Sequence, residues 1–177
     1  MSLLAGPAWR VHLATADITC LRLRLAPYAD RDPWPLTRVM TELTALGARA
    51  VGRPHALGSG RGMPLLHRQA WRWGECELHV EAHHAGGVDE IAVELPPWDE
   101  LVELVAAEDI LWRLIDTIAA ASDARWGVIG DGEALEPGPP SLRRHACILV
   151  ADDRCGARGV AATYTTLPLS GLTVLLR

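Results

Sequence analysis

The stretch that decides the fold is residues 65–84, which read LLHRQAWRW-GE-CELHVEAHH. Both flanks of this stretch, 65–73 and 76–84, largely alternate between apolar and polar residues, as strands with one buried face do. Between them, Gly74-Glu75 has the glycine-first order that suits a type II′ turn. Residues 65–84 therefore predict a β-hairpin.

The charges on the two flanks favour one register for this hairpin. With the turn at Gly74-Glu75, four pairs of residues lie opposite each other: Arg68–Glu81, Arg72–Glu77, Trp71–Leu78 and Gln69–Val80. Two of these pairs join opposite charges, and cross-strand pairs of opposite charge stabilise a sheet. We therefore expect one face of the hairpin to be charged and the other to be buried.

Further strands are expected on both sides of the hairpin, because the same alternation recurs there. They fall in residues 8–26 (two strands), 48–52, 90–95, 125–130, 145–151, 160–166 and 172–176. The glycine- and proline-rich residues 52–64 are expected to form a loop. Residues 152–159 are expected to form a hairpin loop between the strands that flank them.

Two main helices are expected. Asp32-Pro33 combines an N-cap residue with a proline at the first helical position, and the helix that follows should end at Gly47. A longer helix should begin near Asp99 and can break into two around residues 107–109. This order of elements predicts a single α+β domain over residues 1–177. Its sheet would be mainly antiparallel and built of meander hairpins, with the two main helices packed on one face.

The composition excludes several classes of protein. The chain has no Lys, no Asn and no Phe, which indicates the coding bias of a GC-rich bacterial genome and removes lysine-based chemistry. The net charge of −5 argues against a general nucleic-acid binder. No apolar run suits a membrane span, and the first residues do not resemble a signal peptide. We therefore expect a cytoplasmic protein with reduced cysteines and without a cofactor.

The charges are distributed unevenly along the chain. Residues 1–74 carry a net charge of +6, residues 75–136 carry −14 and residues 137–177 carry +3. Within residues 89–109 there are eight acidic residues and no basic one. Either the basic first part packs against the acidic middle of the same molecule, or part of the acidic surface stays unpaired and faces a basic partner.

Our leading hypothesis is a non-catalytic interaction protein, because no candidate group combines a nucleophile with a base and an orienting residue. Six residues would carry partner binding: Glu90, Glu94, Trp98, Asp99, Glu100 and Glu103. Immunity proteins, which neutralise basic nuclease toxins, are a parallel that depends on charge alone. A homodimer, in which the basic part of one subunit meets the acidic part of another, is an alternative.

The competing class is an enzyme or small-ligand binder. On a strand, His79, Glu81 and His83 share one face, and two imidazoles with a carboxylate can hold zinc or non-haem iron. The hairpin register also places Arg68 beside Glu81, which would compete with a metal, so a solvated charged face is the other interpretation. A second candidate is a glycine-rich loop whose backbone amides can hold an anion; it consists of Gly58, Gly60, Arg61 and Gly62.

Overall fold

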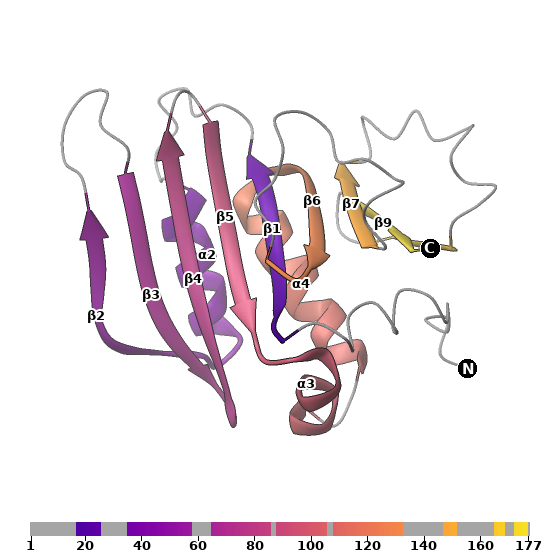
Figure 1. Cartoon of the computed structure of the whole chain (residues 1–177), viewed down its shortest axis with the longest axis horizontal. Coiled ribbons are helices and arrows are strands. Elements are labelled where there is room, and N and C mark those ends of the chain that lie inside the picture. Colours follow the sequence, from indigo (N-terminus) through magenta and orange to yellow (C-terminus); the bar gives the residue numbers. More distant parts are fainter. Residues whose placement is uncertain are drawn as a thin grey trace.

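The computed structural model describes residues 17–25, 35–57, 65–85, 88–105, 108–132, 147–151, 165–168 and 172–176. Within these residues, nine strands form one antiparallel sheet (Figure 1). The strands are β1 (Thr19–Leu25), β2 (Arg49–Leu57), β3 (Leu65–Trp73), β4 (Cys76–Ala85), β5 (Val88–Leu95), β6 (Ala124–Gly130), β7 (Cys147–Ala151), β8 (Thr165–Pro168) and β9 (Leu172–Leu176). The described helices are α2 (Pro35–Ala45), α3 (Trp98–Val105) and α4 (Glu108–Ser122).

The hairpin of β3 and β4 has the register that its charges predicted. Arg68 lies opposite Glu81, and Trp71 lies opposite Leu78. The other two expected pairs, Arg72–Glu77 and Gln69–Val80, are also formed. Gly74 has a positive φ of 59°, whereas Glu75 is not among the residues with positive φ. A positive φ at the first turn residue alone fits the expected type II′ turn.

The strand order of the sheet is β2-β3-β4-β5-β1-β6-β7-β9-β8. Strands β2 to β5 form a meander, and β1 lies in the centre of the sheet between β5 and β6. The hairpin loop expected at residues 152–159 lies outside the described residues, and among the described strands β7 pairs with β9 and not with β8. A local sequence pattern cannot distinguish these pairings, since both bring apolar strands together.

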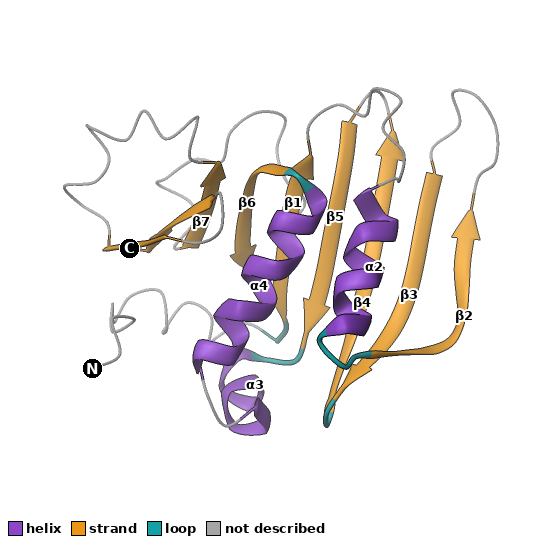
Figure 2. Ribbon diagram, turned by 180° about the vertical axis from the view of Figure 1, so that it is seen from behind, coloured by secondary structure: helices purple, strands orange, loops and turns teal. Residues whose placement is uncertain are grey.

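The two longest helices lie side by side on one face of the sheet, as expected (Figure 2). The core between them and the sheet is formed by the inward side chains of the central strands and the helices, among them Leu21, Leu23, Ile91, Val93, Leu43, Leu111 and Ile115. The long acidic helix is divided, as the sequence allowed, into α3 and α4. Of the helices that the structure describes, none is long and apolar enough to cross a membrane.

One loop expectation is corrected by the structure. Residues 52–57 continue β2 along β3 instead of leaving the sheet. The register between these strands shifts between Val51 and His55, and Gly52 has a positive φ of 71°. Glycine and proline therefore mark a bulge in this edge strand and not its end.

The end of α2 is fixed by a glycine, as predicted. The amide of Gly47 donates to the carbonyl of Thr44 at 3.0 Å, and the amide of Ala48 donates to the carbonyl of Leu43 at 2.9 Å. These two bonds form a Schellman motif, which requires the left-handed conformation that Gly47 adopts with φ of 89°.

Replacing this glycine tests the motif. Gly47→Ala is expected to lower the free energy of unfolding by about 1–2 kcal/mol, because a Cβ disfavours the left-handed conformation. No atom lies within 4 Å of the added methyl, so the loss would come from backbone strain and not from a clash. Urea denaturation of the two proteins measures it, and Gly47→Asn should lose less because Asn tolerates this conformation.

Candidate functional site

The face of the sheet opposite α2 and α4 carries most of the paired charges. Arg22 and Arg24 lie on β1, and their register partners on β5 are Ala92 and Glu90. Further charged side chains of this face come from β3, β4 and β5, among them Arg68, Arg72, Glu77, Glu81 and Glu94. The basic strand β1 is therefore placed directly beside the acidic strand β5 in the middle of the sheet.

Glu90 is held by two arginines. Its Oε1 lies 2.8 Å from Nη1 of Arg22, and its Oε2 lies 3.3 Å from Nη2 of Arg24. The three side chains are 12%, 16% and 15% exposed, so the group is largely removed from water. Arg22 Nε also donates to the carbonyl of Gly132 at 3.0 Å, and the Arg24 guanidinium lies 5.4 Å from the centre of the Trp126 ring. Glu90 is thus part of a structural ion cluster.

A second pairing accounts for two more carboxylates of the charged face. Arg68 Nε lies 3.1 Å from Oε1 of Glu81, and its Nη2 lies 3.2 Å from Oε2 of Glu94. This arginine is the more exposed partner, so each pair is expected to contribute about 0–1 kcal/mol. The partner-binding candidates Glu90 and Glu94 are therefore both matched by arginines of the same chain.

Trp98 is also unavailable to a partner. Its side chain is 2% exposed, and its ring centre lies 5.9 Å from that of Trp112 at an interplanar angle of 55°. This tilted contact joins the start of α3 to α4 within the core. Trp98 therefore anchors α3 to the rest of the fold.

The remaining candidates of α3 lie at the surface. Asp99, Glu100 and Glu103 are exposed, and no arginine in the described parts of the chain pairs with them. Leu104, beside them on the helix, is 40% exposed. These three acidic residues are what remains of the predicted docking surface.

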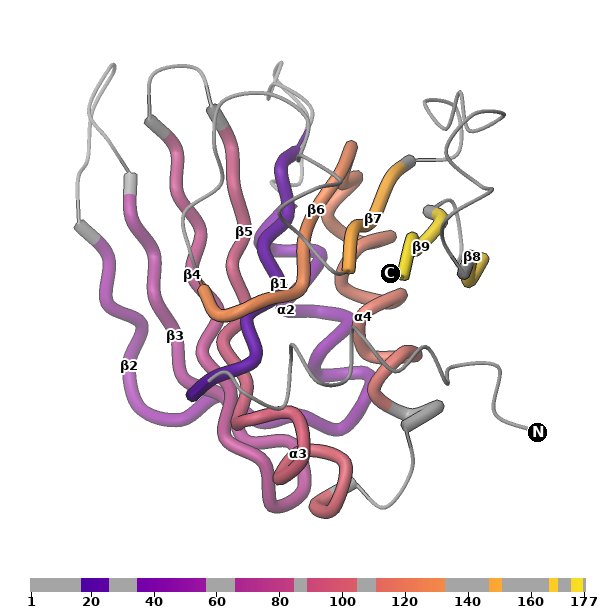
Figure 3. The backbone as a smooth tube through the Cα atoms, turned by 45° about the vertical axis from the view of Figure 1, so that its right-hand side comes forward, coloured from indigo at the N-terminus to yellow at the C-terminus, as the bar shows by residue number. Residues whose placement is uncertain are grey.

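The turn between β3 and β4 adds a fourth carboxylate to this region. In Figures 1 and 3 the turn and α3 lie at the same end of the molecule. Burial raises the pKa of the Cys76 thiol, and the negative charges of Glu100 and Glu75 raise it further. We call Glu75, Asp99, Glu100 and Glu103 the acidic end.

The three candidate metal ligands, His79, Glu81 and His83, are not arranged around a common point. His83 Nε2 lies 3.3 Å from Glu81 Oε2, but His79 Nε2 approaches Glu77 Oε1 at 3.7 Å instead, and Glu81 also binds Arg68. Among the residues that the structure describes, no three His, Cys, Asp or Glu side chains are placed to hold a metal ion. The arrangement is that of a charged face with local ion pairs.

The other small-molecule candidates can be placed as follows. The anion-binding candidates Gly58, Gly60, Arg61 and Gly62 lie outside the described residues. Cys20, Cys76 and Cys147 are free and buried. Burial raises the pKa of Cys20 to about 11, and it also raises the pKa of Cys147. These three thiols are therefore protonated at neutral pH and unsuited to act as nucleophiles.

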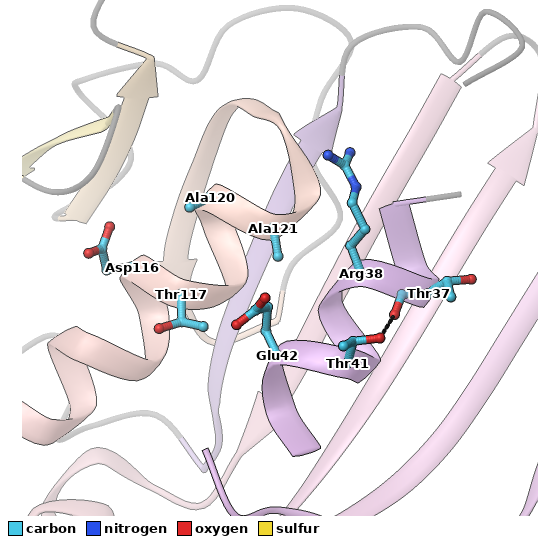
Figure 4. Close-up of a pocket in the computed structure, with 8 residues that line it drawn as sticks. All are labelled: Thr37, Arg38, Thr41, Glu42, Asp116, Thr117, Ala120 and Ala121. Carbon is cyan, nitrogen blue, oxygen red and sulfur yellow. Dashed lines mark hydrogen bonds between the residues drawn. The ribbon is translucent and has the colours of Figure 1, made fainter. Parts of the chain in front are cut away.

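A feature that the sequence did not indicate is a groove of about 590 Å³ between α2 and α4. Figure 4 shows its lining: Thr37, Arg38, Thr41, Glu42, Asp116, Thr117, Ala120 and Ala121. The hydroxyl of Thr41 donates to the carbonyl of Thr37 at 2.9 Å, and Arg38 Nη2 lies 2.6 Å from Asp123 Oδ2. Its lining includes two carboxylates, Glu42 and Asp116, and one guanidinium, Arg38, but no histidine or cysteine.

Sequence reasoning missed the arginine partners of the acidic strand. The signal was present in the alternation of Arg22 and Arg24 with leucines, which places both on one face of their strand. Matching them to Glu90 required the strand order, because they are neighbours across β1 and β5 and far apart in the chain. A search of family models, of curated proteins and of solved structures finds no match to this chain.

Proposed function

We propose that this chain is a non-catalytic interaction protein that docks a basic protein surface on its acidic end. The observation that supports this is the contrast among the acidic residues of the middle of the chain. Glu81, Glu90 and Glu94 are neutralised by arginines of the same chain, whereas Asp99, Glu100 and Glu103 remain exposed. A field of one sign at the surface increases the association rate with partners of opposite charge.

The docking surface of this proposal is smaller than the sequence suggested. Glu90 and Glu94 are paired with arginines on the sheet and Trp98 is buried against α4, so the acidic end supplies the contacts. Leu104 lies beside Glu103 and gives the patch an apolar contact that a partner can bury. The narrower form of the proposal keeps the class of partner that the charge suggests, a protein with a basic surface. A nuclease toxin bound by an immunity protein is one example of this class.

Charge reversal on α3 tests the proposal. Glu100→Arg combined with Glu103→Arg should weaken binding to the basic partner about tenfold or more, mainly by slowing association, and the loss should shrink at high salt. The measurement is capture on the immobilised full chain, followed by titration of the captured protein by calorimetry. A basic protein encoded beside the gene is the first candidate to titrate.

A matched variant separates a local effect from a change in net charge. Glu42 is an exposed acidic residue on α2, outside the acidic end, so Glu42→Arg should bind like the wild type. Glu100→Arg alone is the single-charge comparison. Equal binding by the α3 variants and the wild type, or capture of no basic protein, would remove the proposal.

A further inference from the structure

Two arginines of the sheet face each other without a carboxylate partner. Arg49, the first residue of β2, lies directly opposite Arg72 of β3. Both side chains are exposed, and no ion pair to either is found within the described residues. Like charges placed directly opposite each other destabilise a sheet, so this pair is unfavourable in the isolated molecule. We call these two residues the arginine pair.

Glu77, on the neighbouring strand β4, does not offset the repulsion between the two arginines. Glu77 of β4 lies opposite Arg72 in register, but its carboxylate approaches His79 at 3.7 Å, and no ion pair to Arg72 is formed. Arg68, two residues before Arg72, shows the contrast, because it contacts both Glu81 and Glu94. The arginine pair is thus a basic site with unused capacity for an anionic group.

The arginine pair and the acidic end lie at the same end of the sheet. Strands β3 and β5 run in the same direction, because each is antiparallel to β4. Arg72 is near the last residue of β3, and α3 follows the last residue of β5. Two strand spacings, roughly 10 Å, separate β3 from β5. In Figures 1 and 3 the start of β2, the end of β3 and α3 all lie at this end of the molecule.

We propose that the arginine pair binds the acidic end of a second copy of this chain. A rotation by 180° about an axis between the two sites brings the arginine pair of each copy onto the acidic end of the other. Such an interface uses the same surface twice and closes as a dimer. This inference rests on the proposed function, since it names the basic surface that the acidic end docks.

Charge complementarity within one chain favours a second copy over a foreign protein as the occupant. The chain itself supplies both halves of the contact, and each half lacks a partner within the described molecule. Carboxylates of the second copy would also offset the repulsion between Arg49 and Arg72. A foreign basic protein would instead compete with the second copy for the acidic end.

Mixing two charge-reversed variants tests the interface. One variant carries Arg49→Glu with Arg72→Glu, and the other carries Glu100→Arg with Glu103→Arg. Each alone places like charges in both contacts, so its dimer should dissociate at a concentration about tenfold or more above that of the wild type. The mixture restores opposite charges in both contacts and should form a heterodimer. Light scattering after gel filtration of the full chains, over a dilution series and at two salt concentrations, measures this.

The single variant Arg49→Glu provides a second readout. It replaces the like-charged cross-strand pair by an oppositely charged one. The midpoint of urea denaturation, measured at a concentration at which both chains are monomeric, should therefore rise while dimerisation weakens. If Arg49 had a purely structural role, its replacement would lower both the midpoint of urea denaturation and the affinity of the dimer. Circular dichroism checks that all variants fold.

The outcomes distinguish this inference from the proposed function. A wild-type chain that stays monomeric at every concentration, or variants that do not recover on mixing, would overturn the dimer. If the α3 variants then lose a foreign basic partner while the Arg49 and Arg72 variants keep it, the proposed function stands without the dimer. If neither set of variants changes any binding, both proposals fail.

Discussion

Gly127→Ala is expected to lower the free energy of unfolding by about 3 kcal/mol, because the added methyl group would overlap the neighbouring strand. A Cβ at this position would lie 2.6 Å from the carbonyl oxygen of Arg22 and 2.7 Å from Cδ2 of Leu23. The leucine side chain can move slightly, but the carbonyl belongs to β1 at the centre of the sheet. Relieving the overlap therefore requires the strands β1 and β6 to separate.

A second glycine of the same strand is the control. Gly130 has no atom within 4 Å of the position of a Cβ and does not have a positive φ. Gly130→Ala should leave stability unchanged or raise it by up to about 1 kcal/mol, because alanine restricts the unfolded chain. Urea denaturation of both variants makes the comparison. A loss at Gly127 no larger than that at Gly130 would show that β1 and β6 are less closely packed than described.

The hairpin could be predicted from the sequence because its information is local. Its turn, its alternation and its charge pairs all lie within residues 65–84, and each favours the same register. The end of α2 at Gly47 is local in the same sense, since the capping bonds join residues at most five positions apart. Such elements can be predicted because several features of the same short stretch of sequence favour the same structure.

The strand order could not be predicted, because it depends on contacts between distant parts of the chain. Strand β1 pairs with β5 and β6, and β7 pairs with β9, and nothing in the alternation of these strands selects one partner over another. The bulge of β2 was missed for a different reason. A glycine and a proline near each other are as common in loops as in an edge strand, so the sequence alone favoured a loop.

The candidate site could be predicted only in part, because its ion pairs also depend on contacts between distant parts of the chain. The acidic character of residues 75–136 is a property of composition, and composition can be read without a structure. Which carboxylates remain free depends on the position of the arginines, and this is set by the order β4-β5-β1. The structure therefore divides one predicted acidic face into carboxylates paired with arginines on the sheet and the acidic end, which is formed by α3 and the turn between β3 and β4.

Glu90→Gln is expected to lower the free energy of unfolding by about 2–4 kcal/mol, because it removes the negative charge from between two largely buried guanidinium groups. Arg22 and Arg24 would keep an amide oxygen as a hydrogen-bond acceptor but would repel each other without a carboxylate between them. Glu94→Gln is the matched control on the same strand and face. Its partner Arg68 is 46% exposed, so water can replace the lost contact and the cost should be about 0–1 kcal/mol.

The difference between these two variants measures how far β1 and β5 depend on their ion cluster. Urea denaturation at two salt concentrations is the appropriate measurement, since salt screens the exposed pair of Glu94 but reaches the enclosed carboxylate of Glu90 poorly. The loss at Glu90 should therefore persist at high salt. Equal and salt-sensitive losses would mean that the cluster is open to solvent, and Glu90 would then become available to a basic partner together with the acidic end.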